Sequence, residues 1–374
     1  MFNVDICRLT CQKVWDSIVL KNPLSTSDHL YLTSPEHLLV KVSGHHKYAF
    51  LLPAESVSIA GRKALVSFGN RRSGGLLPLR LKISDEEISE IGEAMMLAIN
   101  GIFQKGYVIV NFTLKTYIND FFNKVLLSML ASSKSNRKIR LLVSVLNARI
   151  LHLRYPSYQH LWSKVYNKKV RNAIRKFERE GGKVEWIRNP LEHFKEIMRI
   201  NWSSPIRQGV LLPTHYTDPH IVFSTLKKYH EIYGRDRIFR VYRAYIQEDE
   251  TIGYAYVLKK GGHAYVSRFL IDMRYSYLNP GEGLLNGILR DLLNERDVKV
   301  VQYGYWSPRA HPGIDHFLKQ FGFVVGQEVA LWFFENKLDF KLLNTYLRLK
   351  QAYIPLRHVI KRLARESVPL FKWV

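Results

Sequence analysis

Cysteine is nearly absent from this chain, because Cys7 and Cys11 are the only two among 374 residues. A single C-x3-C pair, with no second pair and no clustered histidines, is a poor zinc signature, and two apolar thiols are the better interpretation. The chain also lacks a disulfide framework, which fits a reducing compartment. Cysteine content therefore excludes a disulfide-stapled secreted scaffold, and we expect no metal cofactor.

Long hydrophobic runs are missing as well. The most apolar region, residues 94–112, is interrupted by Asn100, Gln104 and Lys105, so it does not suit a membrane span. Residues 1–8 lack the apolar core of a signal peptide. We expect a soluble, cytoplasmic protein, and peripheral contact with the inner face of the membrane stays open.

Acidic residues are scarce. The chain has 32 Asp and Glu against 56 Lys and Arg, a formal net charge of +24. This excess favours a polyanionic partner, such as nucleic acid, an anionic membrane or a phosphate-bearing substrate, although a general solubility role gives the same composition. A hydrophobic content of 47% indicates a folded protein, and the length suits two domains.

The segment from residue 252 to 323 is the most informative part of what is present. Residues 252–258 and 263–272 are predicted strands around a glycine turn, and 298–305 is a third strand. A glycine-rich turn at 279–283 opens a predicted helix, and 313–321 forms a second one. The free backbone N–H groups and positive dipole at such a helix start suit a phosphate or pyrophosphate.

The first half of the chain reads as mixed α/β. Residues 1–35 are predicted as helix and loop, a capping-box-like pattern at Ser84 starts a helix, and 141–145 and 148–153 are predicted as two strands. The join between the halves is expected near Pro156. We therefore expect domains at 1–156 and 157–335, followed by a tail at 336–374.

The tail has its own composition. Residues 341–374 carry eight Lys and Arg against one Glu, with apolar residues at helical spacing. A basic amphipathic tail can lie on an anionic membrane or on RNA. It can equally pack on the domain and leave a solvated basic face.

Three segments of the second half resemble the GNAT acyltransferase superfamily. The nearest branch holds the Fem-type peptidoglycan-bridge aminoacyltransferases and the cellulose/exopolysaccharide acetyltransferase-like proteins. Residues 171–181 are similar to that branch's basic R-x-x-I-R-K-A-x-K-x-G helix, 280–284 to the acyl-donor loop, and 313–323 to the closing G-L-x-x-F-K-x-x-F-G motif. Residues 68–75 resemble the glycine-rich loop of the branch's degenerate first domain.

The resemblance implies an α/β (α+β) fold of tandem GNAT-like domains with mixed central sheets flanked by helices. It also implies that the donor loop binds an acyl donor, acyl-CoA above all and aminoacyl-tRNA as the second choice. The loop residues are Pro280, Gly281, Glu282, Gly283 and Leu284.

The chain departs from the family pattern at three positions. Leu278 stands where the donor loop usually has Gln or Arg, Leu318 where the Fem branch has its lysine, and Gln302 where many relatives have an acid. Lys319 follows one place later, about 100° round the helix. These departures put the chemistry in doubt more than the fold.

Acyl transfer needs a polarised carbonyl, a neutral nucleophile and a proton donor for the leaving group. Between the strands at 263–272 and 298–305 the candidates for catalysis are Tyr305, His311, Asp272 and Lys319. His311 has a side chain that titrates near neutrality, although an exposed loop histidine would look the same. Asp272 could orient an amine or cap the loop that follows it.

The basic residues of the helix after Asn167 form a second candidate site. They could grip the phosphates of a tRNA or of a lipid-linked sugar, or they could be a solvated face. The residues are Lys168, Lys169, Arg171, Arg175 and Lys176.

The sequence thus predicts an acyltransferase that acts on an amine or hydroxyl of a polar, anionic acceptor. The alternative is a catalytically inactive descendant that binds RNA or an anionic membrane.

Overall fold

The computed structural model describes residues 3–10, 36–43, 47–59, 62–66, 77–78, 85–107, 109–114, 120–135, 139–204, 206–207, 210–231, 238–247, 250–260, 262–295, 297–305, 312–335 and 341. The predicted tail from 342 onward, the loop at 68–75 and His311 lie outside these residues. The basic tail and the domain boundaries at 156 and 335 therefore stay predictions.

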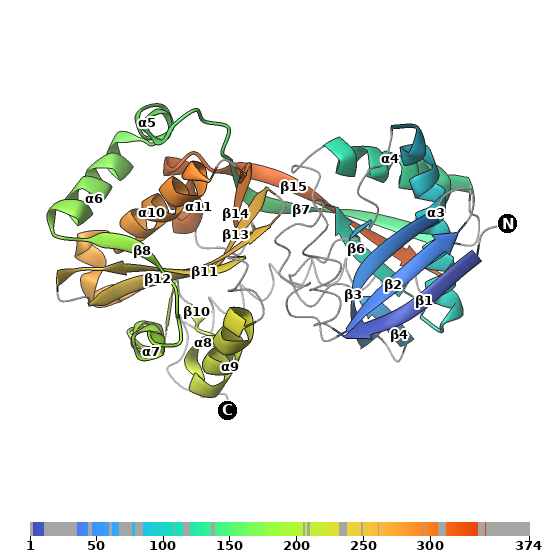
Figure 1. Ribbon diagram of the computed structural model, residues 1–374, viewed down its shortest axis with the longest axis horizontal. Coiled ribbons are helices and arrows are strands. Elements are labelled where there is room, and N and C mark those ends of the chain that lie inside the picture. Colours follow the sequence, from blue (N-terminus) through green and yellow to red (C-terminus); the bar gives the residue numbers. More distant parts are fainter. Residues whose placement is uncertain are drawn as a thin grey trace, which may run out of the picture.

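One large mixed sheet runs through both halves of the molecule (Figure 1). Its strands follow the order β1-β2-β3-β4-β6-β15-β7-β14-β13-β12-β11-β8, and β5 pairs with β3. The strands of the first half are β1 (Asn3–Thr10), β2 (Glu36–Ser43), β3 (Lys47–Ile59), β4 (Arg62–Val66), β5 (Leu77–Pro78), β6 (Ile109–Leu114) and β7 (Arg140–His152). Those of the second half are β8 (Lys183–Ile187), β11 (Phe239–Tyr245), β12 (Thr251–Lys260), β13 (His263–Ile271), β14 (Val300–Tyr305) and β15 (Val324–Phe334), with β9 (Ile206–Arg207) and β10 (Val210–Leu211) as a separate pair.

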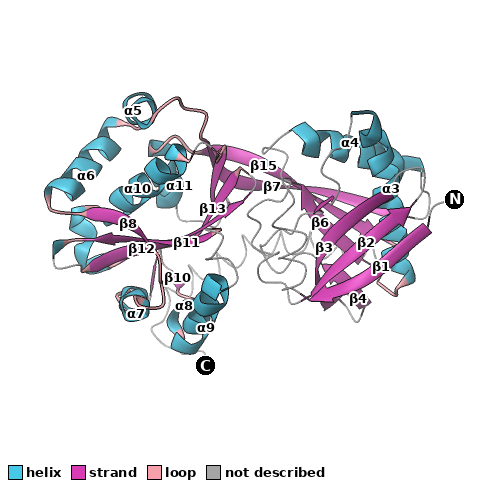
Figure 2. Cartoon of the chain, in the orientation of Figure 1, coloured by secondary structure: helices cyan, strands magenta, loops and turns pink. Residues whose placement is uncertain are grey.

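Helices cover both faces of the sheet (Figure 2). Those of the first half are α3 (Asp85–Gln104) and α4 (Asp120–Ser135). The second half has α5 (Tyr158–His160), the π-helical turn η2 (Leu161–Val165), α6 (Lys168–Arg179), α7 (Phe194–Trp202), α8 (Thr214–Thr217), α9 (Pro219–Tyr229), the 3₁₀ helix η5 (Met273–Leu278), α10 (Pro280–Asn294) and α11 (Pro312–Gln320). This arrangement confirms the predicted mixed α/β fold with helices flanking a central sheet.

Two long strands connect the halves. β7 and β15 pair antiparallel from Ile150 with Val324 to Arg140 with Phe334, and β15 also pairs with β6 of the first half. The sequence predicted two strands at 141–145 and 148–153, whereas β7 is one continuous strand. Asn147, which suggested the break, pairs within the ladder opposite Gln327.

The prediction of helix and loop for residues 1–35 is wrong for residues 3–10, which form β1. The segment is an edge strand whose eight residues pair antiparallel with β2. Val4 packs against the core of the first half. Tertiary pairing with an apolar neighbouring strand outweighs the weak local pattern.

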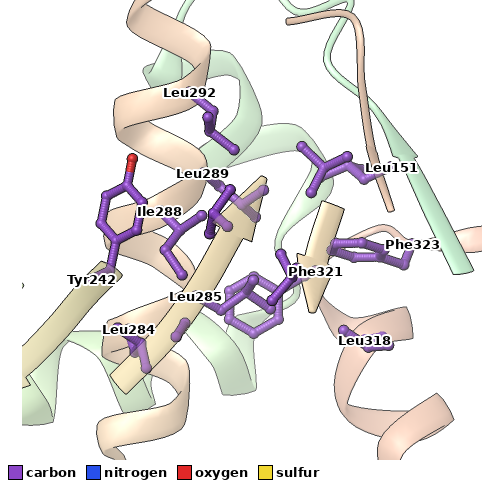
Figure 3. Close-up of a cluster of buried hydrophobic side chains, with 14 of the residues drawn as sticks. Leu151, Tyr242, Leu284, Leu285, Ile288, Leu289, Leu292, Leu318, Phe321 and Phe323 are labelled. Atoms are coloured by element: carbon purple, nitrogen blue, oxygen red, sulfur yellow. The ribbon is translucent and has the colours of Figure 1, made fainter. Parts of the chain in front are cut away.

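The second half has a separate core on each face of its sheet. Helices α6, α10 and α11 bury their apolar sides on one face, in the cluster of Figure 3. The α10 residues Leu284, Leu285, Ile288, Leu289 and Leu292 are all completely buried there. Helices α7 and α9 cover the other face, against Tyr254 and Tyr256 of β12. The site described below lies where β13 and α10 meet.

Candidate active site

The strands β13 and β14 part in the middle of the second half. They pair in parallel over four residue pairs, from His263 with Val300 to Val266 with Tyr303. Beyond that point β13 runs on to Ile271, whereas Tyr305 of β14 pairs with β7 instead.

The ladder between β12 and β13 shifts at the same level, because Tyr256 faces Arg268 while Val257 faces Val266. A bulge of this kind bends a strand and re-aims its backbone groups. The edge of β13 after Val266 is thus placed to donate backbone N–H bonds to a ligand carbonyl.

The turn after β13 leads directly into α10. η5 ends at Asn279, whose φ of 59° is left-handed, and Pro280 begins the helix. The Gly283 N–H already donates to the Asn279 carbonyl at 3.2 Å, and Pro280 has no N–H. Among the described residues no acceptor meets the N–H of Gly281. The first-turn amide that a donor phosphate could use therefore belongs to Gly281 above all.

The two glycines of the donor loop have different reasons to be glycine. A Cβ on Gly283 would lie 2.3 Å from Cδ1 of Phe177 in α6, which no side chain can occupy. A Cβ on Gly281 would find only ordinary contacts, 3.8 Å from Phe269 and 3.9 Å from Ile271. Gly283 thus serves helix packing, whereas Gly281 is buried but has room for a Cβ. Leu284, the last predicted loop residue, belongs to the core.

Glu282 introduces a negative charge into the same turn. Burial raises the pKa of its carboxyl, while a hydrogen bond from its own backbone amide and the Lys169 ammonium act in the opposite direction. A raised pKa lowers the cost of neutralising this carboxyl when an anion binds beside it. Lys169 of α6 therefore lies close enough to the donor loop to affect its electrostatics.

The five basic residues of α6 do not form one patch. Arg171 is committed to the backbone, since its Nη1 donates to the carbonyls of Trp162, Ser163 and Tyr166 at 3.2, 3.2 and 3.0 Å. The Arg175 guanidinium lies 5.6 Å from the Trp162 ring centre. Lys176 donates to the Tyr277 carbonyl at 2.7 Å and so ties α6 to η5.

Lys168, Lys169 and Arg175 are the exposed members of this set, and no carboxylate of a described residue forms an ion pair with either lysine. The two lysines are the best placed of the five to meet a polyanion. Arg171, Arg175 and Lys176 each contact a group within the protein, and these contacts explain their positive charges without a ligand.

This division predicts opposite outcomes for two variants. Arg171→Gln is expected to lower the free energy of unfolding by about 1–2 kcal/mol, because three carbonyls lose a charged donor, and to leave the salt dependence of RNA binding unchanged. The double variant Lys168→Gln/Lys169→Gln should keep its stability and reduce that salt slope by about two. Urea unfolding and RNA binding at several salt concentrations measure both. A reduced salt slope for Arg171→Gln would contradict the assignment.

Asp272 is fully buried, and its carboxylate accepts four hydrogen bonds from two arginines. Arg274 donates to it from its backbone N–H and from Nε, both at 3.1 Å, and from Nη2 at 2.7 Å, and Arg199 of α7 donates at 3.1 Å. Burial acts to raise the pKa of this carboxyl, but the Arg274 hydrogen bonds and the two positive charges hold it below its usual value. A carboxylate with a lowered pKa and four hydrogen bonds is a weak base. It suits holding η5 in place better than moving a proton.

The other predicted catalytic residues are spread around the strand ends. Tyr305 lies at the end of β14, and Lys319 is exposed on α11 while its neighbour Leu318 is 1% exposed in the core. Leu278 and Gln302 are both buried, so the family departures at these positions fill the interior.

Sequence reasoning missed two arginines of this region. Arg199 links α7 to Asp272, to Glu250 and to the Thr251 carbonyl. Arg268 is buried in β13 and stacks on Tyr216 and Tyr256. The sequence could have pointed to Arg268, because it is a charged residue within an otherwise apolar predicted strand. Nothing in the sequence pointed to Arg199, because basic residues are common on the polar face of an amphipathic helix.

Two other kinds of site are missing from the described residues. Within these parts of the chain, no group of three or more His, Cys, Asp or Glu residues is arranged to hold a metal ion. Every described helix is too short or too polar to span a bilayer.

Comparison with known proteins supports the GNAT resemblance. Residues 164–307 match the family of the acetyltransferase (GNAT) domain. The crystal structure of FemX is similar with a TM-score of 0.58 and 12% identity, over 87% of this chain and 96% of that one. The C-terminal domain of a putative lysylphosphatidylglycerol synthetase from Agrobacterium fabrum has a TM-score of 0.50 and 11% identity, over 90% of this chain and 95% of that one.

A conserved protein of unknown function from Bacteroides thetaiotaomicron is also similar, with a TM-score of 0.50 and 9% identity over 89% of this chain and all of that one. No curated protein matches the sequence. At these identities the structures show a shared fold, and the domain match adds an acyl-transfer chemistry. These matches support an N-acyltransferase or aminoacyltransferase, and residues 164–307 are accordingly a GNAT domain within a fold shared with FemX.

Proposed function

We propose that this protein transfers an acyl group from acyl-CoA to an amine or hydroxyl of an anionic acceptor. The observation that carries the proposal is the position of the Gly281 N–H, which has no acceptor among the described residues, at the helix start that directly follows the parted end of β13. A pyrophosphate at α10 would leave the attached acyl arm close to the gap between β13 and β14. Aminoacyl-tRNA is the second candidate donor, favoured by the exposed Lys168 and Lys169.

The chain's own groups suit the first part of this reaction. The edge of β13 after Val266, where pairing with β14 has ended, would offer backbone N–H groups to the acyl carbonyl oxygen, on which negative charge develops as the acceptor attacks. The carbon–sulfur bond of the thioester then breaks, the thiolate takes a proton and the acyl group stays on the acceptor. Tyr305 and His311 are the proposed proton-moving residues, because both follow the parted segment of β14 in the chain.

The proposal is tested by isothermal titration with acetyl-CoA and with free CoA at two salt concentrations. We expect binding that keeps most of its strength at the higher salt, because directed backbone N–H bonds are screened less than surface charge pairs.

Gly281→Asp should weaken CoA binding at least about tenfold, since it adds a negative charge where the phosphate accepts its hydrogen bonds. Gly281→Ala is the matched control and should retain binding, because its Cβ meets only ordinary contacts. Equal binding by the wild type and Gly281→Asp would show that the donor lies elsewhere.

The rival function is an inactive descendant that binds RNA or an anionic membrane. Leu278 and Leu318 favour it, because both replace polar family residues with buried apolar ones. The same titration separates the two, since this rival binds no CoA and loses its polyanion affinity when Lys168 and Lys169 are neutralised.

A further inference from the structure

The described residues contain four buried arginines, and three of them have a carboxylate partner. Arg149 pairs with Asp315, Arg240 with Glu295 and Arg243 with Glu185. Arg268 is 9% exposed, and no carboxylate of a described residue lies within ion-pair distance of it. Its neighbours are neutral, namely the rings of Tyr216 and Tyr256, at 4.5 and 5.1 Å, and the His215 carbonyl, which accepts from its Nη2 at 2.7 Å.

Two polar atoms in this cluster lack a hydrogen-bond partner among the described residues. They are Nη1 of Arg268 and the hydroxyl oxygen of Tyr256. The two side chains come from directly paired positions on β12 and β13, so they lie on the same face of the sheet. Burial raises the pKa of Tyr256 to about 12, although the charge of Arg268 and the hydrogen bonding of its side chain oppose this. The phenol therefore remains a proton donor near neutrality, beside a second donor.

A buried cation without a counter-charge is costly. Removing an ion from water costs several kcal/mol, and proteins normally offset this with an opposite charge. Cation–π contacts with two tyrosines offset only part of this cost. The arrangement is therefore unfavourable for folding alone and favourable for receiving an oxyanion.

The position of Arg268 fits a role in substrate binding. It is the residue that follows the extra residue of the bulge, at the level where β13 and β14 part. Its neighbours Tyr216 and Tyr256 belong to the face covered by α7 and α9, opposite the face that holds α10. An acceptor that enters from this side would bring its anionic group to Arg268 and its nucleophile toward the parted strands.

We propose that Arg268, with Tyr256, binds an oxyanion of the acceptor, a carboxylate or a phosphate, and so sets the acceptor specificity of the enzyme. This inference rests on the proposed acyl transfer and adds the residues that would hold the anionic group of the acceptor. Tyr216 belongs to α8, a helix of four residues held through the Asn201 and Trp202 side chains at 2.7 and 3.1 Å. The anion would displace the Tyr216 ring from the guanidinium face.

The test measures the unfolding temperature of the full-length protein in sodium acetate, sodium phosphate and sodium chloride at equal ionic strength. Acetate and phosphate are the probes that separate a carboxylate from a phosphate site. We expect one of them to raise the unfolding temperature of the wild type by about 3 °C relative to chloride. Arg268→Met should lose this increase.

The matched control is Arg290→Met. It removes the same charge from an exposed arginine that lies 6.0 Å from the Tyr158 ring centre, and it should keep the anion-dependent increase. In chloride, Arg268→Met should unfold at the same temperature as the wild type or higher, because it removes an uncompensated buried charge. A merely structural arginine would instead give a clear decrease in chloride.

Two outcomes would overturn the proposal. One is an anion effect that persists in Arg268→Met, and the other is the absence of an anion effect in the wild type. If Arg268→Met does not fold, Arg268→Lys decides, because it keeps the charge and loses the two-pronged fork. An unchanged anion effect in that variant overturns the proposal.

Titration of the same variants with CoA separates this inference from the proposed function. CoA affinity should not change in Arg268→Met. A wild type that shows the Arg268-dependent anion effect but binds no CoA would refute the donor and leave the anion site in place.

Discussion

Gly283→Ala is expected to lower the free energy of unfolding by about 2 kcal/mol, whereas Gly281→Ala should leave it nearly unchanged. Both residues are glycines in the first turn of one helix, two positions apart. A Cβ added at Gly283 would lie 2.3–2.7 Å from three atoms of the Phe177 ring, which is itself 2% exposed. Helices α6 and α10 would have to separate, because a buried ring cannot move aside in a close-packed core.

Urea unfolding of both variants measures the difference. Replacing Phe177 with the smaller Leu in the Gly283→Ala protein should recover part of the loss, because the two changes act at one contact and are therefore not additive. Equal stability of the Gly281→Ala and Gly283→Ala proteins would contradict the packing assignment. So would a double variant whose loss equals the sum of the two single losses.

Asp272→Asn is expected to lower the free energy of unfolding at pH 7 by about 2 kcal/mol, and this difference should disappear in acid. Removing one partner of a buried ion pair costs about 3–5 kcal/mol. The effect is smaller here because Arg199 and Arg274 have side chains that are 33% and 58% exposed. Asn retains the size of Asp and part of its capping ability, so the variant removes mainly the charge.

The direction of the pH dependence follows from the pKa of Asp272, which the arginines hold below its usual value. A carboxyl with a depressed pKa contributes its full stability above the unfolded value of about 3.9, and the contribution is lost as the pH falls through the folded value. Urea unfolding of both proteins at pH 7, 5 and 2 measures the difference. Glu196 and Glu295 also have lowered pKa values, but they are common to both proteins and cancel. A difference that persists at pH 2 would show that Asp272 acts through shape and not through charge.

The order of elements in the second half could be predicted from local signals. Alternating and apolar runs gave β12, β13 and β14, and the glycine turn at 279–283 marked the region where α10 begins at Pro280. The resemblance to the GNAT superfamily followed from the same segments, and the domain match at residues 164–307 confirms it.

The roles of individual residues could not be predicted in the same way. In the sequence Arg171 looked like part of a phosphate-binding face, but its guanidinium donates to three backbone carbonyls. Gly283 looked like a phosphate-binding glycine, and its N–H and its missing Cβ are both used inside the protein. In each case the deciding partner lies in another element.

By itself, the sequence determined the class of fold, the glycine turn that begins α10 and the excess of positive charge, because these depend on residue types and spacings within one segment. Only the tertiary structure decided which glycine excludes a Cβ and which has room for one, which carboxylate has all its hydrogen bonds, and which buried arginine has no carboxylate partner among the described residues. Those properties depend on distances between segments such as Phe177 and Gly283, which are 106 positions apart in the chain and in contact in the fold. Burial then sets their energies, since the same charge or methyl group that costs little in water costs several kcal/mol in a close-packed interior.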